Sequence, residues 1–409
     1  MSSAGADRTL VIRDGTLIDG SGRPPVPNDA LVIEGHRIKN VGRLPESLRS
    51  SGGRDDVQVI DASGQWIMPG LIDAHTHLSY GFPHLRGEGR GRGTMRPELG
   101  VLKAAWSAQK VLRSGVTSIS VPGGTWFTDV GVRDAIKLGV LEGPRVHCAG
   151  RMIITYGSIE DDEPSWVGTP DHSVGVLCNS AAEMVTEVRR QCKHGVNFVK
   201  MADSRSGDLQ EGRDRRGRRR GAPSRRASRD PLARRRLHTG CRRGRGGLDH
   251  PLRPGERGRS GRCRAGGGGD PADHDVPGNG GGSERPLRPG DDPDGRGRIL
   301  CGTDTGNNSF MPFGELHAKE LEIFVTYCGF TPMEALVAAT RGNAFAVGLE
   351  GDLGVLEAGK LADIVVLRRD PLADIRSLAG GRELACIIKD GAVVSLGDGG
   401  GEPQPLALG

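Results

Sequence analysis

The chain has 409 residues and a formal net charge of +5, and its residues are 35% hydrophobic and 4% aromatic. This length excludes a small disulfide-stabilised scaffold and allows one large domain with an appendage or two to three ordinary domains. The chain has no long apolar run and no signal-peptide pattern at its start, which predicts a cytosolic protein rather than a membrane or secreted one. The eight cysteines form no CxxC pair, so reduced and mostly buried thiols are expected.

Short apolar runs rich in β-branched residues occur near both ends of the chain. The runs at 9–12 and 30–33 are punctuated by glycines, which predicts strands with turns between them. The runs at 362–367 and 385–391 have the same pattern and are expected to complete the same sheet. Both chain ends therefore contribute to one small β-domain. Its two parts are residues 8–67 and 351–397.

Residues 68–350, apart from the segment 213–298, alternate apolar strands with helical stretches, which predicts a parallel sheet covered by helices. The capping box formed by Thr331 and Glu334, with Pro332 at the first helical position, predicts a helix that continues through Ala346. The other predicted strands are 117–121, 145–149, 198–201 and 298–301, and the other predicted helices are 98–113 and 181–191.

The composition changes sharply between residues 213 and 298. This segment contains 24 Arg, 20 Gly and 9 Pro among its 86 residues, and it contains no Phe, Trp, Tyr or Lys. Its net charge is +13, so the rest of the chain carries −8. The segment has no helical or strand periodicity and too few apolar residues to offset the entropy of folding, which predicts disorder for it as written.

Two interpretations of the segment 213–298 are open. One is an Arg/Gly-rich nucleic-acid-binding region, but single-strand binders place aromatic residues among the cations for base stacking, and this segment has none. The other is a reading-frame slip in a GC-rich gene. Reading the codons of residues 270–277 one base later permits Ile-Pro-Leu-Ile-Met-Thr-Phe-Leu, which has the pattern of a buried strand. We favour the frame slip and do not expect nucleic acid as a partner.

Four polar residues follow or end predicted strands. His75 and His77 come directly after an apolar strand, and residues i and i+2 of extended backbone point to the same side, so both imidazoles can bind one ion. Asp304 lies among small residues that let a substrate approach, with a turn or helix-cap aspartate as the alternative. Lys200 ends an apolar strand, where a lysine is costly unless paired or modified; the alternative is a strand-end lysine that extends its amine to solvent.

Two tyrosines lie in loops after predicted strands. Tyr80 and Tyr156 are candidates to hold a substrate carbonyl, with packing at the rim of the fold as the alternative for both. The remaining histidines have no partner at ligand spacing and are expected to be structural or surface residues. Those considered are His36, His84, His147, His172, His194 and His317.

These motifs together resemble one known family. Residues 68–77, Met-Pro-Gly-Leu-Ile-Asp-Ala-His-Thr-His, are similar to the opening motif of the metal-dependent amidohydrolase superfamily, in its imidazolonepropionase-like and Xaa-Pro dipeptidase-like branch. Residues 197–200 resemble that branch's fourth-strand lysine motif, and 302–306 resemble its eighth-strand aspartate motif. Residues 357–364 resemble the segment in which such chains return to their β-domain. The resemblance covers residues 8–212 and 299–397.

The resemblance implies an α/β fold, namely a (β/α)8 TIM barrel over residues 68–350, interrupted by the segment 213–298, with a small β-sandwich domain formed from both chain ends. It also implies one or two divalent metal ions, with zinc expected. By the same resemblance, His75, His77 and Asp304 bind the first ion, and Lys200, carboxylated by carbon dioxide, bridges to the second. Manganese, iron and cobalt suit the same ligands.

The reaction implied by the resemblance is hydrolysis of an amide, a cyclic amide or another C–N bond in a small-molecule substrate. Asp304 is expected to take the proton of a metal-activated water and to pass it to the leaving nitrogen. The oligomeric state, including a homo-oligomer, is left open by the sequence.

The resemblance is incomplete in the middle of the chain. The family takes two more histidines from its fifth and sixth barrel strands, and both positions fall within 213–298. His238 and His250 are the nearest candidates, but neither follows an apolar strand, so no role is transferred to them. The alternatives to a hydrolase are therefore a non-catalytic, damaged barrel and an Arg/Gly-rich nucleic-acid-binding protein.

Overall fold

A computed structural model describes residues 9–49, 56–80, 96–161, 165–166, 168, 173–202, 299–306 and 313–396. The segment 213–298, with His238 and His250, lies outside these ranges, as do His84 and His172. Among the helices within them, none combines the length and the apolar character needed to cross a membrane.

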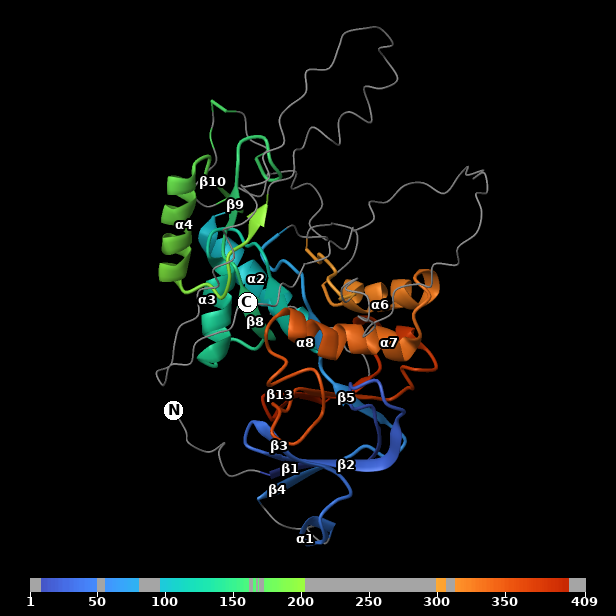
Figure 1. Ribbon diagram of the computed structural model, residues 1–409. Coiled ribbons are helices and arrows are strands. Elements are labelled where there is room, and N and C mark those ends of the chain that lie inside the picture. The colour runs from blue at the N-terminus through green and yellow to red at the C-terminus, as the bar shows by residue number, and fades with distance from the viewer. Residues whose placement is uncertain are drawn as a thin grey trace, which may run out of the picture.

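The two chain ends form one mixed sheet of eight strands, with the order β14-β13-β12-β5-β1-β2-β3 and with β4 paired to β1. The two ends meet where β5 runs antiparallel to β12. In Figure 1 the blue N-terminal strands and the red strand β13 lie together at the bottom of the view. The strands are β1 (Thr9–Leu17), β2 (Val26–Glu34), β3 (Arg37–Gly42), β4 (Val57–Asp61), β5 (Trp66–Pro69), β12 (Ile364–Leu367), β13 (Leu384–Lys389) and β14 (Ala392–Leu396).

The eight-stranded sheet curls around its own apolar face. Ile33 and Ile38, from one end of the sheet, share a buried cluster with Ile364 and Ile388 from the other end. Strand β3 also hydrogen-bonds to the segment that precedes β12, because Ile38 N–H donates to the carbonyl of Lys360 at 2.9 Å. The joining of both chain ends in one sheet is as the sequence predicts. A sandwich of two sheets stays a prediction.

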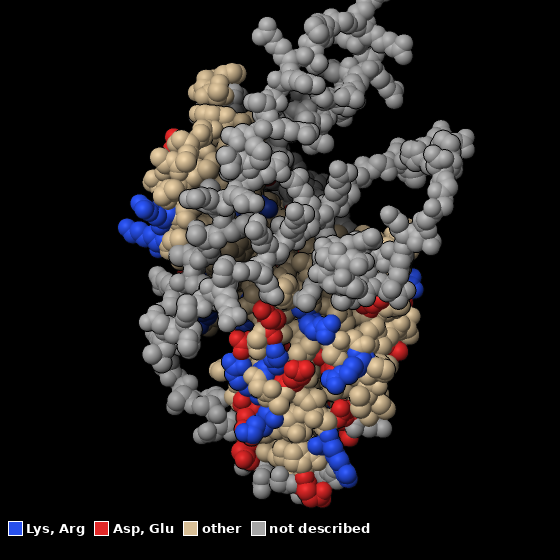
Figure 2. Space-filling model, in the orientation of Figure 1, with Lys and Arg blue, Asp and Glu red and all other residues tan. Residues whose placement is uncertain are grey.

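The visible outer face of this lower half carries acidic and basic side chains side by side rather than a patch of one sign (Figure 2). Ion pairs of the sheet include Lys39 with Glu34, at 3.2 Å, and Arg37 with Asp352, at 2.9 Å. On this visible face, the described residues therefore show mixed charges rather than one large basic patch.

The chain passes from this sheet into a parallel one at Gly70, between β5 and β6 (Leu71–Asp73). A Cβ atom at Gly70 would lie 2.2 Å from the hydroxyl oxygen of Thr117, so only glycine fits at this crossing. Strand β6 pairs in parallel with β7 (Val116–Val121), and β7 pairs in parallel with β8 (Arg145–Cys148). A second parallel sheet has β9 (Met152–Ile154) between β10 (Gly175–Leu177) and β11 (Met201–Ala202).

Backbone hydrogen bonds extend the parallel sheet in both directions. On one side, the Asn197 N–H donates to the carbonyl of Cys148, at 2.8 Å, and the Ile153 N–H donates to the carbonyl of Lys200. On the other side, the Ala74 N–H donates to the carbonyl of Cys301, at 3.1 Å. The described segments therefore form an arc in the order 301–306, β6, β7, β8 and 197–202. The strands needed to close a barrel are expected within 213–298, so the closed (β/α)8 barrel stays a prediction.

The helices agree with the sequence patterns at their starts. The Thr331 hydroxyl accepts from the Glu334 N–H, which forms the expected capping box, and a second capping box pairs Ser180 with Glu183. The helix expected to run through Ala346 contains a π-helical turn, η3 (Ala338–Gly342). The other helical elements are α1 (Glu46–Arg49), α2 (Pro97–Arg113), α3 (Thr128–Lys137), α4 (Ala181–His194), α6 (Glu315–Tyr327), α7 (Pro332–Val337), α8 (Asn343–Ala346) and the 3-10 segment η4 (Ile375–Gly381).

Candidate metal centre

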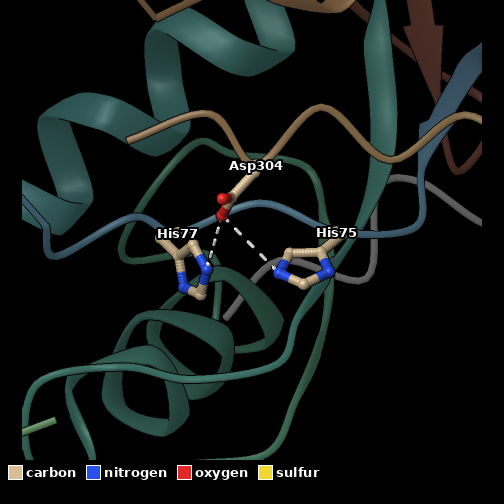
Figure 3. Close-up of side chains that lie close together, drawn as sticks. All are labelled: His75, His77 and Asp304. Atoms are coloured by element: carbon tan, nitrogen blue, oxygen red, sulfur yellow. Dashed lines mark ion pairs between the residues drawn. The ribbon is translucent and has the colours of Figure 1, made fainter. Parts of the chain in front are cut away.

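Two histidines and an aspartate meet where β6 ends beside the segment 301–306 (Figure 3). The Nε2 atoms of His75 and His77 lie 3.6 and 3.0 Å from Oδ1 of Asp304. One donor atom from each of the three residues lies within 4.8 Å of those of the other two. Two imidazole nitrogens and one carboxylate oxygen at this spacing are a partial ligand set for a divalent transition metal.

The backbone of Asp304 is fixed against the strand that carries the histidines. The Asp304 N–H donates to the carbonyl of His75, at 2.7 Å, and the His77 N–H donates to the carbonyl of Thr305, at 2.8 Å. Asp304 has a φ of 53°, in the left-handed region that non-glycine residues seldom adopt outside turns and functional sites. Because hydrogen bonds on both sides hold this conformation, the carboxylate faces the two imidazoles.

His77 is held in a defined orientation. Its Nδ1 lies 2.6 Å from the carbonyl oxygen of Gly123, and its ring stacks on that of Tyr80, with centroids 4.0 Å apart and planes 8° apart. A carbonyl oxygen can only accept, so Nδ1 carries the hydrogen and Nε2 is the atom that faces Asp304. A histidine that binds a metal commonly donates its other N–H in this way. The residues present therefore fit a metal ion on the evidence of their own hydrogen bonds.

The electrostatics of the site keep His75 neutral at neutral pH. Its pKa is lowered to about 4, mainly because burial penalises the charged imidazolium and next because the neighbouring His77 repels a second positive charge. Asp304 acts in the opposite direction, and the ammonium of Lys200 lowers the pKa further. A neutral imidazole is the form that binds metals. The effect of Lys200 on His75 places its charge within electrostatic reach of the site.

The two predicted tyrosines occupy different environments. Tyr80 is 1% exposed and packs with Met152, Ile154 and Val174 behind His77. Tyr156 is 68% exposed in the loop after β9, where its backbone N–H donates to Oδ1 of Asn179. Tyr80 thus lies against a proposed ligand, whereas the side chain of Tyr156 extends into solvent.

A buried polar network beneath the three residues was not predicted from the sequence. The carboxylate of Asp73 bonds to Thr303 and to Nδ1 of His317, which lies in α6. Glu320, one turn further along α6, accepts from the thiol of Cys301, and its pKa is raised to about 7 by burial and by the charge of Asp73. Asp73 and His317 are 244 positions apart, so no spacing in the sequence could have indicated their contact.

Parts of the chain match known proteins. Residues 294–394 match the amidohydrolase family. The imidazolonepropionase of Rubrobacter xylanophilus is 40% identical over 77 residues, which cover 19% of each chain. That of Cupriavidus necator is 26% identical over 189 residues, covering 40% of this chain and 43% of the relative. The chain thus matches about a fifth of the first relative and less than half of the second.

The fold is also similar to that of solved structures. A prolidase crystallised with N-methylphosphonate-L-proline superposes with a TM-score of 0.62, over 95% of this chain and all of the prolidase chain. The two sequences are 17% identical, so this likeness shows the fold alone.

Proposed function

Because the chain belongs to the amidohydrolase superfamily, we propose that it is a metal-dependent hydrolase that cleaves an amide, a cyclic amide or another C–N bond. The strongest support is the convergence of His75, His77 and Asp304, whose donor atoms meet at the ends of two neighbouring parallel segments. Active sites of (β/α)8 enzymes lie at this end of the strands.

His75 and His77 would hold a divalent ion, zinc in our proposal, through their Nε2 atoms, and Asp304 would hold it through its carboxylate. Bound there, the ion would lower the pKa of a water molecule and polarise the scissile carbonyl. Lys200, converted by carbon dioxide to a carbamate, would supply an anionic ligand to a second ion. This conversion replaces an ammonium, whose charge opposes cation binding near His75, with a negative group.

Asp304 is the proposed proton carrier. Its side chain is 31% exposed, so one carboxylate can face both the imidazoles and an incoming substrate. The carboxylate would accept the proton that the attacking water loses as its oxygen bonds to the carbonyl carbon. It would then deliver that proton to the nitrogen as the C–N bond breaks. The proton lost by the water is thus the proton gained by the leaving nitrogen, and Asp304 ends in its starting state.

The proposed substrate is a small molecule with a carbonyl next to nitrogen. Such substrates suit the names of the similar proteins, an imidazolonepropionase and a prolidase. Tyr156, which is largely exposed, is proposed to contact the substrate. Tyr80 is better placed to hold the ring of His77, because it is buried and stacked against it.

Metal content and hydrolysis together test the proposal. The purified chain is stripped with a chelator, reloaded with zinc, and assayed on N-acyl amino acids, dipeptides ending in proline, and cyclic amides. We expect zinc to bind at a stoichiometry of about one or two per chain and to restore hydrolysis. His77→Ala should lose both properties. The matched control is His36→Ala, which removes an exposed histidine of the β-domain that bonds to the carbonyl of Asp390. A folded chain that binds no zinc would contradict the proposal and favour the non-catalytic alternative.

A further inference from the structure

We propose that Asp73, together with His317, is a positioning residue that holds the two ligand-bearing segments of the metal centre in register. This inference rests on the proposed function, because it assigns Asp73 a role in the affinity of the same site. Neither residue is in the proposed ligand set. Both act through the backbone and side-chain contacts that surround His75 and Asp304.

The carboxylate of Asp73 is buried, with the residue 1% exposed, and its two oxygens accept four hydrogen bonds. Oδ1 accepts from the backbone N–H of His75, at 2.9 Å, and from the backbone N–H of Thr303, at 3.3 Å. Oδ2 accepts from the hydroxyl of Thr303, at 2.5 Å, and from Nδ1 of His317, at 2.6 Å. The Asp73 side chain therefore connects the proposed ligand His75 to Thr303, the residue directly before the proposed ligand Asp304.

The contact with Thr303 controls the conformation of Asp304. Thr303 precedes Asp304 directly, and its hydroxyl oxygen also accepts from the N–H of Thr305, at 3.1 Å. The left-handed Asp304 is therefore held between two threonines, one of which is bonded to Asp73. A residue in this conformation persists only where its surroundings hold it, so loosening Thr303 should let the carboxylate turn away from the histidines.

His317 stabilises the buried carboxylate of Asp73. A buried anion without sufficient hydrogen-bond donors is unstable, and the imidazole of His317 supplies a donor from α6. His317 is 3% exposed and reaches Asp73 from outside the two ligand segments. The network thus connects the position of α6 to the geometry of the metal centre.

The main test replaces Asp73 by Asn, which preserves the size of the side chain. It puts an NH2 group, which cannot accept a hydrogen bond, in place of Oδ1 or Oδ2, each of which accepts two. We expect D73N to bind zinc about 10- to 100-fold more weakly in competition with a chromogenic chelator, the range typical for groups that orient metal ligands. The visible spectrum of the cobalt-loaded protein should change as well, since it reports ligand geometry. A purely structural role would lower the unfolding temperature without altering affinity or spectrum in the folded protein.

The matched control is Asp363→Asn. Asp363 is also a buried aspartate, 4% exposed, and it accepts from the backbone N–H of Asp390 and pairs with Arg145, away from the three ligand residues. D363N should lose stability and retain the zinc affinity and cobalt spectrum of the wild-type chain. His317→Asn, which can place an amide donor near the position of Nδ1, should bind zinc more tightly than His317→Ala.

The outcomes separate the inference from the proposed function. If the wild-type chain binds zinc and D73N binds it equally well with the same cobalt spectrum, the positioning role is overturned and the proposed function stands. If the folded wild-type chain binds no zinc, both fail. Should D73N not fold, Thr303→Val removes only the hydroxyl bonds, and unchanged zinc affinity in T303V and H317A overturns the inference.

Discussion

Replacing Asn343 by Asp tests how the strand of the two histidines is joined to the segment of Asp304. Asn343, the first residue of α8, is 0% exposed. Its Nδ2 donates to the carbonyls of Ile72, at 2.5 Å, and Cys301, at 2.7 Å, and its Oδ1 accepts from the N–H of Cys301, at 3.1 Å. One amide thus clamps β6 to the neighbouring segment just below the candidate metal centre.

The N343D variant changes few atoms but removes the donor of two hydrogen bonds. A carboxylate oxygen would face two carbonyl oxygens, of which that of Cys301 keeps the N–H of Ala74 as a donor, at 3.1 Å. Two lost hydrogen bonds cost about 0.5–1.5 kcal/mol each, and a carbonyl left without a donor costs a further ~1–3 kcal/mol. The expected loss is therefore about 4 kcal/mol. At about 2–4 °C per kcal/mol for a domain of this size, the unfolding temperature should fall by about 8–16 °C.

The assay is thermal unfolding followed by circular dichroism at pH 7. The matched control is Asn40→Asp, because the amide of Asn40 makes an exposed hydrogen bond of 3.4 Å to the carbonyl of Arg43, whose loss should cost less than about 0.5 kcal/mol. Protonation would restore one donor to the new carboxyl, so N343D should recover part of its stability at acid pH. A decrease in unfolding temperature no larger than that of N40D would refute the clamp.

Three further predictions address other parts of the molecule. Gly306→Ala should lower the free energy of unfolding by more than about 2 kcal/mol and weaken zinc binding, because its Cβ would lie 2.2 Å from the carbonyl oxygen of His77 and its φ is 96°. The control is Gly64→Ala, which has open space around it and should cost only about 1 kcal/mol. Equal losses of stability in the two variants would contradict this prediction. Burial raises the pKa of Asp129 to about 6 from 3.8, so Asp129 should make the chain less stable as the pH rises from 4 to 7, by at most about 3 kcal/mol. Urea unfolding at both pH values should show this difference in the wild type and not in D129N. Sequencing an independent clone should find a base inserted or deleted near codon 212 and a compensating change near codon 298. The restored frame should encode apolar strands and two histidines. An unchanged frame would refute the frame-slip hypothesis.

Features set by neighbouring residues could be predicted from the sequence. The capping box of Thr331 and Glu334 is observed, and the strands 117–121 and 145–149 agree with β7 and β8 to within one residue. Hydrogen bonds of the first helical turn and the alternation of strand side chains depend on a few adjacent positions, so composition and order are sufficient to specify them. The proximity of the His75 and His77 side chains follows from the same local geometry.

Other features depend on residues that meet only in the folded chain. The expected strand at 298–301 is not a strand over its described residues, 299–301; instead, residues 301–305 make separate backbone hydrogen bonds to the histidine segment. The apolar run 66–73 divides at Gly70 between two sheets, and Thr117 of a later strand leaves no space for a side chain at this position. The burial of Tyr80 likewise depends on Met152 and Val174, and no property of its own segment indicates it.

The sequence by itself determined the candidate ligands, the helix starts and the strand-forming ends of the chain, because each is encoded within a few consecutive residues. Only the tertiary structure decided that Asp304 faces two histidines more than 220 positions earlier, and that Asp73 is bonded to His317 of α6. Such contacts form because parallel strands bring the same ends of distant segments together, and the pairing of strands depends on packing over the whole sheet. The geometry of this candidate metal site is therefore a property of the fold, while the chemical types of its candidate ligands are a property of the sequence.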